Sequence, residues 1–138
     1  MATTIINTIK SLQKTYVDLD INFLTNPGTG DITIKKNVES IKQSIRNLLM
    51  TKMYERPFQA NLYSGIYDLL FENFTGTTKY TLEKIIRNLL STYEPRINVI
   101  DVNIIDNSVM NGLDISLTFE VISLSIITTY SVTLERTR

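Results

Sequence analysis

The chain has 138 residues, of which 43% are hydrophobic and 20% are charged, the composition of an ordinary globular protein. We expect residues 1–138 to form one domain, with residues 1–17 as a helical N-terminal extension. Fourteen basic residues balance fourteen acidic ones, which argues against nucleic-acid binding because that depends on neutralising phosphates. Cysteine and histidine are absent, which excludes disulfides, thiolate metal sites and Ser-His-Asp or Cys-His catalysis.

No apolar run approaches the about 20 residues that a membrane-spanning helix needs. Residues 1–14 lack the basic region and the continuous apolar stretch of a signal peptide. We therefore expect synthesis in a reducing interior and no membrane partner.

The first part of the chain predicts a short helix and then a small hairpin. Apolar residues fall at helical spacing over residues 5–16, at Ile5, Ile9, Leu12 and Tyr16. Residues 18–24 alternate as a strand would, with Leu19, Ile21 and Phe23 on one side. A turn over residues 26–30 leads to a return strand at residues 32–34.

Three helices are predicted for the middle of the chain. An apolar stripe predicts a helix over residues 38–52, and a shorter one follows over residues 62–70. Thr77 or Thr78 is placed to cap a third helix, which ends near Tyr93 because a proline follows two residues later.

Beyond residue 96 the apolar period changes from helical to two. Residues 97–104 predict a strand with a bulge, and Asn111-Gly112 is a strong hairpin-turn signal. Residues 113–121 alternate without fault, and residues 130–134 predict a third strand. The expected class is α+β, with a small N-terminal hairpin and two to three central helices packed on a C-terminal three-stranded antiparallel sheet. The last strand is expected to be short and to lie at an edge, where its backbone can pair with another chain.

The triplet Glu94-Pro95-Arg96 is the first candidate for function. It lies where the third predicted helix meets the first sheet strand, and the proline makes that junction rigid. Arg96 offers a planar fork for carboxylates or carbonyls of a partner. The alternative is an internal salt bridge between Glu94 and Arg96 that braces the corner.

The segment Arg56-Pro57-Phe58 is the second candidate. It is either a docking loop with Phe58 as its anchor or, as residue statistics favour, a loop whose phenylalanine fills the core.

The segment Phe71-Glu72-Asn73 is the third candidate. One hypothesis makes Glu72 a catalytic acid that pairs with Glu94, as the two carboxyls of a glycosidase do. The simpler expectation places Phe71 in the core, with Asn73 as a helix C-cap and Glu72 at the helix end. The sequence has no glycine-rich phosphate loop and no residues spaced as metal ligands usually are. We therefore expect no cofactor and no small-molecule ligand.

These segments, in this order, resemble the baseplate wedge and sheath-initiator family of contractile phage tails, to which a type VI secretion baseplate component is related. The similarity runs from residue 18 to the C-terminus and is most specific in residues 70–75 and 93–97, around the Glu-Pro-Arg hallmark. After residue 58 the chain departs from the family, which has a proline and then an aromatic-glycine pair where this chain has Gln59-Ala60-Asn61.

The resemblance implies a structural role without enzymatic activity, in the tail baseplate of the virion after assembly in the host cytoplasm. It implies that Glu94, Pro95 and Arg96 dock on a helical bundle of the larger wedge proteins. It also implies that the last strand offers an edge to the first ring of tail sheath, and that six copies surround the tail axis. The residues assigned to that sheath contact are Tyr130, Val132 and Leu134.

Two alternatives stay open. One is a lysozyme-like glycosidase that uses Glu72 and Glu94, because members of this family have been described as lysozyme-like. The other is a generic soluble adaptor unrelated to tails.

Overall fold

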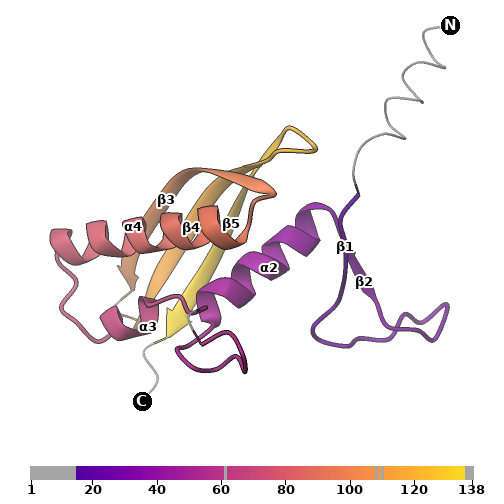
Figure 1. Cartoon of the computed structure of the whole chain (residues 1–138), viewed down its shortest axis with the longest axis horizontal. Helices are drawn as coiled ribbons and strands as arrows, with labels where there is room; N and C mark the ends of the chain where they lie inside the picture. The colour runs from indigo at the N-terminus through magenta and orange to yellow at the C-terminus, as the bar shows by residue number, and fades with distance from the viewer. Residues whose placement is uncertain (1–14, 61, 108, 110, 136–138) are drawn as a thin grey trace, which may run out of the picture. The chain divides into compact units, whose positions relative to one another are not determined.

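The computed structural model describes residues 15–60, 62–107, 109 and 111–135 (Figure 1). The helix expected over residues 5–16 lies almost wholly outside this part of the chain. Two compact units make up the chain, with their boundary between Lys42 and Gln43. The expectation that they fold as one domain stays a prediction.

The first unit contains the expected hairpin. Strand β1 (Val17–Leu19) pairs antiparallel with β2 (Ile34–Lys36), with Leu19 opposite Ile34. The turn over residues 26–30 is confirmed: the Gly30 N–H donates to the carbonyl of Asn26 over 2.8 Å, and Gly30 has a φ of 71°. A glycine suits that position because side chains disfavour positive φ.

The predicted strand over residues 18–24 is wrong beyond Leu19, because Asp20 makes a turn there. Its carboxylate accepts the Asn22 N–H at 3.0 Å and its carbonyl accepts the Phe23 N–H at 3.0 Å. An aspartate that bonds the backbone two residues on offers the chain an alternative to the sheet ladder. Phe23 therefore has a φ of 51° and a side chain that is 65% exposed.

Asp20 itself is buried, at 2% exposure, and its oxygens are satisfied within the hairpin. The Thr33 hydroxyl donates to it over 3.3 Å and the Lys35 ammonium lies 3.4 Å away. The Asn22 N–H and then the Lys35 charge hold the pKa of Asp20 below its usual value, against the opposing effect of burial.

Helix α2 (Val38–Met50) forms where the apolar stripe predicted it. Its buried side chains recur at helical spacing, at Ile41, Ile45, Leu48 and Leu49. Thr51 follows its end, and the Thr51 hydroxyl donates to the Asn47 carbonyl over 2.6 Å. One unpaired carbonyl of the last turn is thereby satisfied.

Helix α3 (Ile66–Leu69) is shorter than the predicted range 62–70. The Ser64 N–H donates to the Thr51 carbonyl over 3.1 Å, which holds the chain extended before the helix. Gly65 then takes a φ of 64° as N-cap, a conformation that favours glycine.

Helix α4 (Gly76–Tyr93) ends at Tyr93, as predicted. Its N-cap is Thr75 and neither Thr77 nor Thr78: the Thr75 hydroxyl accepts the Thr78 N–H at 3.2 Å. Thr78 is not the cap, but its own hydroxyl donates to the Asn73 carbonyl, just before the helix, over 3.0 Å.

The C-terminal sheet has the order β3 (Ile97–Asn107), β4 (Gly112–Val121) and β5 (Ile126–Glu135), all antiparallel. The predicted bulge is confirmed between Val99 and Asp101. Strand β5 lies at an edge as expected, but it is not short, because it pairs along the whole of β4.

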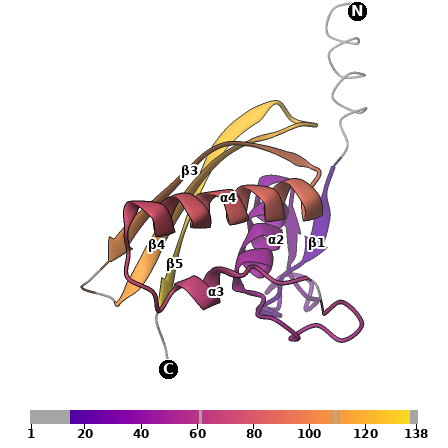
Figure 2. The ribbon, with the colours of Figure 1, turned by 60° about the vertical axis from the view of Figure 1, so that its left-hand side comes forward.

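Helix α4 lies across one face of this sheet, next to β3 (Figures 1 and 2). The facing side chains of the central strand are all buried: Leu113, Ile115, Leu117, Phe119 and Val121. The other face of β4 carries polar side chains, so the strict alternation in the sequence reports one packed and one solvated face. The α+β expectation is confirmed.

Candidate docking site

The corner between α4 and β3 is built by Glu94, Pro95 and Arg96. The Glu94 N–H ends the helix by donating to the Leu90 carbonyl over 2.9 Å. The Arg96 carbonyl accepts the Ile122 N–H at 3.1 Å, so the corner is also tied to the β4–β5 turn. Because proline fixes φ between these two anchors, the corner is rigid.

Glu94 and Arg96 form a bidentate ion pair within this corner. The Arg96 Nε lies 2.5 Å from Glu94 Oε1, and Arg96 Nη2 lies 2.7 Å from Oε2. The Glu94 side chain is 2% exposed and the Arg96 side chain 24%. A buried carboxylate requires such a partner. The internal salt bridge foreseen as the alternative to docking is therefore present, and the guanidinium keeps part of its surface in solvent.

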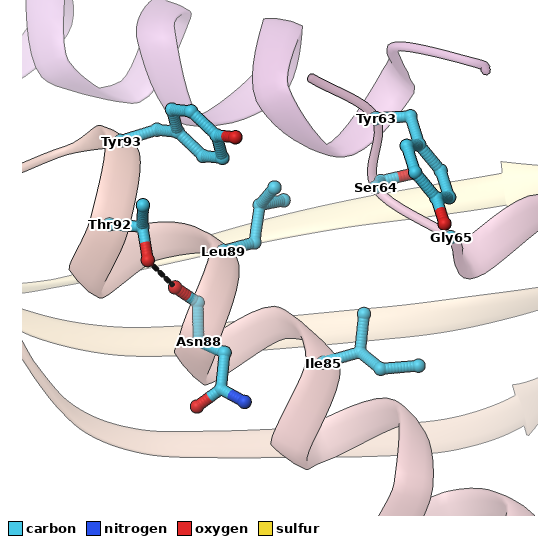
Figure 3. Close-up of a pocket in the computed structure, with 8 residues that line it drawn as sticks. All are labelled: Tyr63, Ser64, Gly65, Ile85, Asn88, Leu89, Thr92 and Tyr93. Carbon is cyan, nitrogen blue, oxygen red and sulfur yellow. Dashed lines mark hydrogen bonds between the residues drawn. The ribbon is translucent and has the colours of Figure 1, made fainter. Parts of the chain in front are cut away.

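Tyr93, directly before the corner, separates two hollows. One has a volume of about 360 Å³ and extends along α4 to Ile85, and Figure 3 shows Tyr93, Leu89 and Ile85 facing Tyr63 across it. The other, of about 610 Å³, lies between Tyr93 and the loop that carries Phe58. Phe58, from the second candidate, thus lies across a hollow from Tyr93, the residue that precedes the first candidate.

Phe58 is fully exposed, with a relative exposure of 106%. The expectation that it fills the core is wrong, and the docking-loop alternative fits its position. Its φ of 67° and the bond from the Gln59 N–H to the Arg56 carbonyl place it in a tight turn that follows Pro57. That turn points the ring away from the core, and Arg56 and Pro57 are exposed beside it.

Phe71 and Asn73 do not take their expected places, whereas Glu72 lies at the end of α3, where its N–H donates to the Leu69 carbonyl over 3.2 Å. Phe71 is 60% exposed, because α3 ends early and Leu70 occupies the core instead. Asn73 is not the C-cap of α3, which is Leu70, but its carbonyl receives the Thr78 hydroxyl at the start of α4. Glu72 is exposed and lines none of the hollows described above.

The residues expected at the sheath contact, Tyr130, Val132 and Leu134, share the core-facing side of β5. They lie opposite Leu117, Ile115 and Leu113 of the central strand. Leu134 is buried at 1% exposure, whereas Tyr130 and Val132 are half-buried. A partner strand would therefore meet the backbone of β5 before it met these side chains.

Among residues 15–60, 62–107, 109 and 111–135, no group of three or more acidic residues is arranged to hold a metal ion. Within those same ranges, none of the helices combines the length and the apolar character that crossing a bilayer demands.

Comparisons with known proteins agree on one family. The family described as baseplate wedge protein gp25 matches residues 35–125. The chain is 33% identical over 95 residues to baseplate wedge protein gp25 of Enterobacteria phage T4, covering 69% of this chain and 71% of that protein.

Solved structures share the fold. A putative tail lysozyme from Geobacter sulfurreducens has a TM-score of 0.67 at 26% identity, over 72% of this chain and 91% of its own. A chain of the anti-feeding prophage baseplate has a TM-score of 0.63 at 22% identity, over 95% and 92%. One from the postcontracted pyocin R2 baseplate has 0.57 at 14% identity, over 86% and 99%. At those identities the last two establish the fold alone.

Fold and sequence similarity together define a structural component of a tail baseplate. More narrowly, the chain belongs to the baseplate wedge protein gp25 family, which confirms the resemblance found in the sequence.

Proposed function

We propose that this subunit docks on the larger baseplate wedge proteins through the corner Glu94-Pro95-Arg96 and presents β5 to the first ring of tail sheath. The observation that carries the proposal is the corner itself. A buried ion pair fixes Arg96, and helix and turn bonds tie both ends of the triplet. The guanidinium is thereby pre-organised for a partner, which lowers the entropy cost of binding.

The second half of the proposal rests on the sheet edge. Strand β5 is ten residues long and pairs only with β4 in the described sheet, so one row of its backbone groups remains for an added strand. Residues 97–135 carry five carboxylates and no lysine or arginine. That charge favours a basic partner strand.

In this proposal the subunit assembles in the host cytoplasm, six copies surround the tail axis, and it needs no cofactor. It is also not an enzyme. Glu94 is bound on both oxygens by Arg96, whereas a general acid must deliver a proton to substrate, and neither Glu72 nor Glu94 lines the hollows beside Tyr93. Clearing of peptidoglycan that disappears in Glu72→Gln and Glu94→Gln variants would establish the glycosidase instead.

Complementation of tail assembly tests the edge contact. Ser131→Lys places a charge on the exposed side of β5, and Ser116→Lys places the same charge opposite it on the central strand. Edge lysines block strand addition. We expect Ser131→Lys to give baseplates without sheath and Ser116→Lys to give normal tails. Sheathed tails with both variants would refute the edge contact.

A further inference from the structure

The three-stranded sheet has two edges, and their surroundings differ. Strand β3 forms the edge opposite β5, and helix α4 lies beside it (Figure 2). The pairing of β3 is interrupted by the bulge between Val99 and Asp101, whereas β5 pairs with β4 without a register shift from Ile126 to Glu135. An open β3 edge would be a second place at which a strand could add to this sheet.

Arg87 of α4 binds a backbone carbonyl on the outer side of β3. Its Nη1 donates to the Val99 carbonyl over 3.1 Å. The Ile122 N–H donates to the Arg96 carbonyl, and along an antiparallel ladder such hydrogen-bonded pairs alternate with pairs whose backbone groups point outward. Val99 is three residues beyond Arg96 and lies opposite Phe119, so its carbonyl points away from β4. Arg87 therefore takes an acceptor that an added strand would need.

Lys79 of α4 crosses the same edge further along. Asn103 belongs to the solvated face of the sheet, because its neighbours Val102 and Ile104 are buried on the face that α4 covers. The Lys79 ammonium nevertheless donates to the Asn103 side chain over 3.3 Å. Its side chain must therefore pass from the helix around the edge of β3.

Lys79, Glu83 and Arg87 form a charged row on α4. They are spaced by four residues and so lie on one face of the helix. The Glu83 carboxylate lies 4.0 Å from the Lys79 ammonium. The row extends over about 12 Å of helix, and its two partners on β3, Val99 and Asn103, are about 13 Å apart along the strand. The charged row thus matches the length of edge that it covers.

The outer side of β5 lacks this protection. Residues 126–134 carry no charged side chain, and Thr129 and Ser131 on the solvated side are exposed. Natural sheets close an edge with lysines, with a bulge or with a covering helix. Strand β3 combines all three, whereas β5 has neither a lysine nor a bulge.

We propose that the charged row of Lys79, Glu83 and Arg87 determines which edge of the sheet accepts a strand: it closes β3, so that a partner strand adds only along β5. This inference rests on the proposed edge contact of β5 and deepens it by naming the residues that make that contact one-sided. With β3 open, the β5 edge of one copy could pair with the β3 edge of the next, and such head-to-tail contacts grow into filaments. Closing β3 keeps the β5 edge of the free subunit available for the sheath.

Sedimentation velocity of the purified full chain over a range of concentrations tests the proposal. The double variant Lys79→Ala with Arg87→Ala removes both cations of the charged row. The control, Arg46→Ala with Lys84→Ala, removes the same charge at two exposed positions outside the row. Circular dichroism first establishes that both variants are folded. We expect the sedimentation coefficient of the row variant to rise with concentration, and those of wild type and control to stay constant.

Adding Ser131→Lys to the row variant identifies the edges that pair. This lysine blocks β5, so we expect the sedimentation coefficient to return to the wild-type value. Three results would overturn the proposal: a row variant that sediments as wild type does, a control that self-associates equally, or self-association that persists with Ser131→Lys. Each of them leaves the β5 contact standing, because tail complementation tests that contact separately. Sheathed tails with Ser131→Lys would refute the β5 contact, and this inference with it.

Discussion

Replacing Arg96 with alanine removes both hydrogen-bond partners of a carboxylate that is almost wholly buried. Glu94 loses contacts of 2.5 and 2.7 Å, and the fixed corner leaves its side chain no route to solvent. Leaving a buried charge without its partner is one of the few mechanisms by which a single substitution strongly destabilises a protein.

The size of the loss follows from the exposure of the pair. Removing one partner of a fully buried ion pair costs about 3–5 kcal/mol. Arg96 keeps about a quarter of its side-chain surface in water, so solvent already screens part of the interaction. We therefore expect the free energy of unfolding to fall by about 2–3 kcal/mol, below the full buried value. With a urea m-value of about 2 kcal/mol/M, the unfolding midpoint moves down by about 1–1.5 M.

Urea unfolding, followed by circular dichroism, measures this loss. Arg46→Ala serves as the control, because Arg46 is an exposed arginine on α2, and its free energy of unfolding should stay within about 0.5 kcal/mol of the wild-type value. The double variant Glu94→Leu with Arg96→Met replaces the pair by apolar residues and should regain stability to within about 1 kcal/mol. If Arg96→Ala unfolds no earlier than Arg46→Ala, the pair does not brace the corner.

Further substitutions test the rest of the fold. The change in the free energy of unfolding is measured by thermal or chemical denaturation, unless another method is named. Thr75→Ala removes the N-cap bond of α4 and should cost about 1 kcal/mol. Phe119→Ala empties a fully buried site on the central strand and should cost about 3–5 kcal/mol. Gly112→Ala places a Cβ 2.5 Å from the Leu134 carbonyl oxygen and should cost about 1–3 kcal/mol, whereas Gly76→Ala meets open space and should be neutral or stabilising. The lowered pKa of Asp20 means that its contribution to hairpin stability is present above its ordinary pKa and is lost as the pH falls through the folded value. An NMR pH titration should therefore show an Asn22 amide signal, bonded to the Asp20 carboxylate, that shifts below pH 3.8 in wild type, and this shift should be lost in Asp20→Asn.

Hydrophobic periodicity predicted the parts of the fold whose packing follows a repeat. The alternation over residues 113–121 specified both the buried and the solvated face of β4, and the stripe of α2 specified its buried side. The bulge near residue 100 was also visible, because one extra residue shifts the alternating set to the other face.

The misses share a physical cause, which is that single hydrogen bonds override local patterns. Asp20 diverts an alternating segment into a turn, and the bond between Ser64 and Thr51 shortens α3. The second bond joins residues distant in the sequence, so no window over residues 62–70 could reveal it. The exposure of Phe71 follows from the early end of that helix.

The sequence predicted individual residues of the candidate site but not the surface that they form in the fold. The sequence singled out the corner and the Phe58 loop separately, and the fold places Phe58 across a hollow from Tyr93, the residue before the corner. Phe58 was assigned to the core because large apolar residues usually lie there. Its positive φ, which points the ring outward, had no signal in the sequence beyond the proline that precedes it.

The most direct test of the central claim is co-elution with the larger wedge proteins in size-exclusion chromatography. Wild type is compared with the double variant Glu94→Leu and Arg96→Met, after urea unfolding has shown that this variant is folded. The account predicts that wild type co-elutes and the folded double variant does not, which makes the corner a docking site as well as a brace. Equal co-elution of both would contradict it, because the ion pair would then serve only the fold of this subunit.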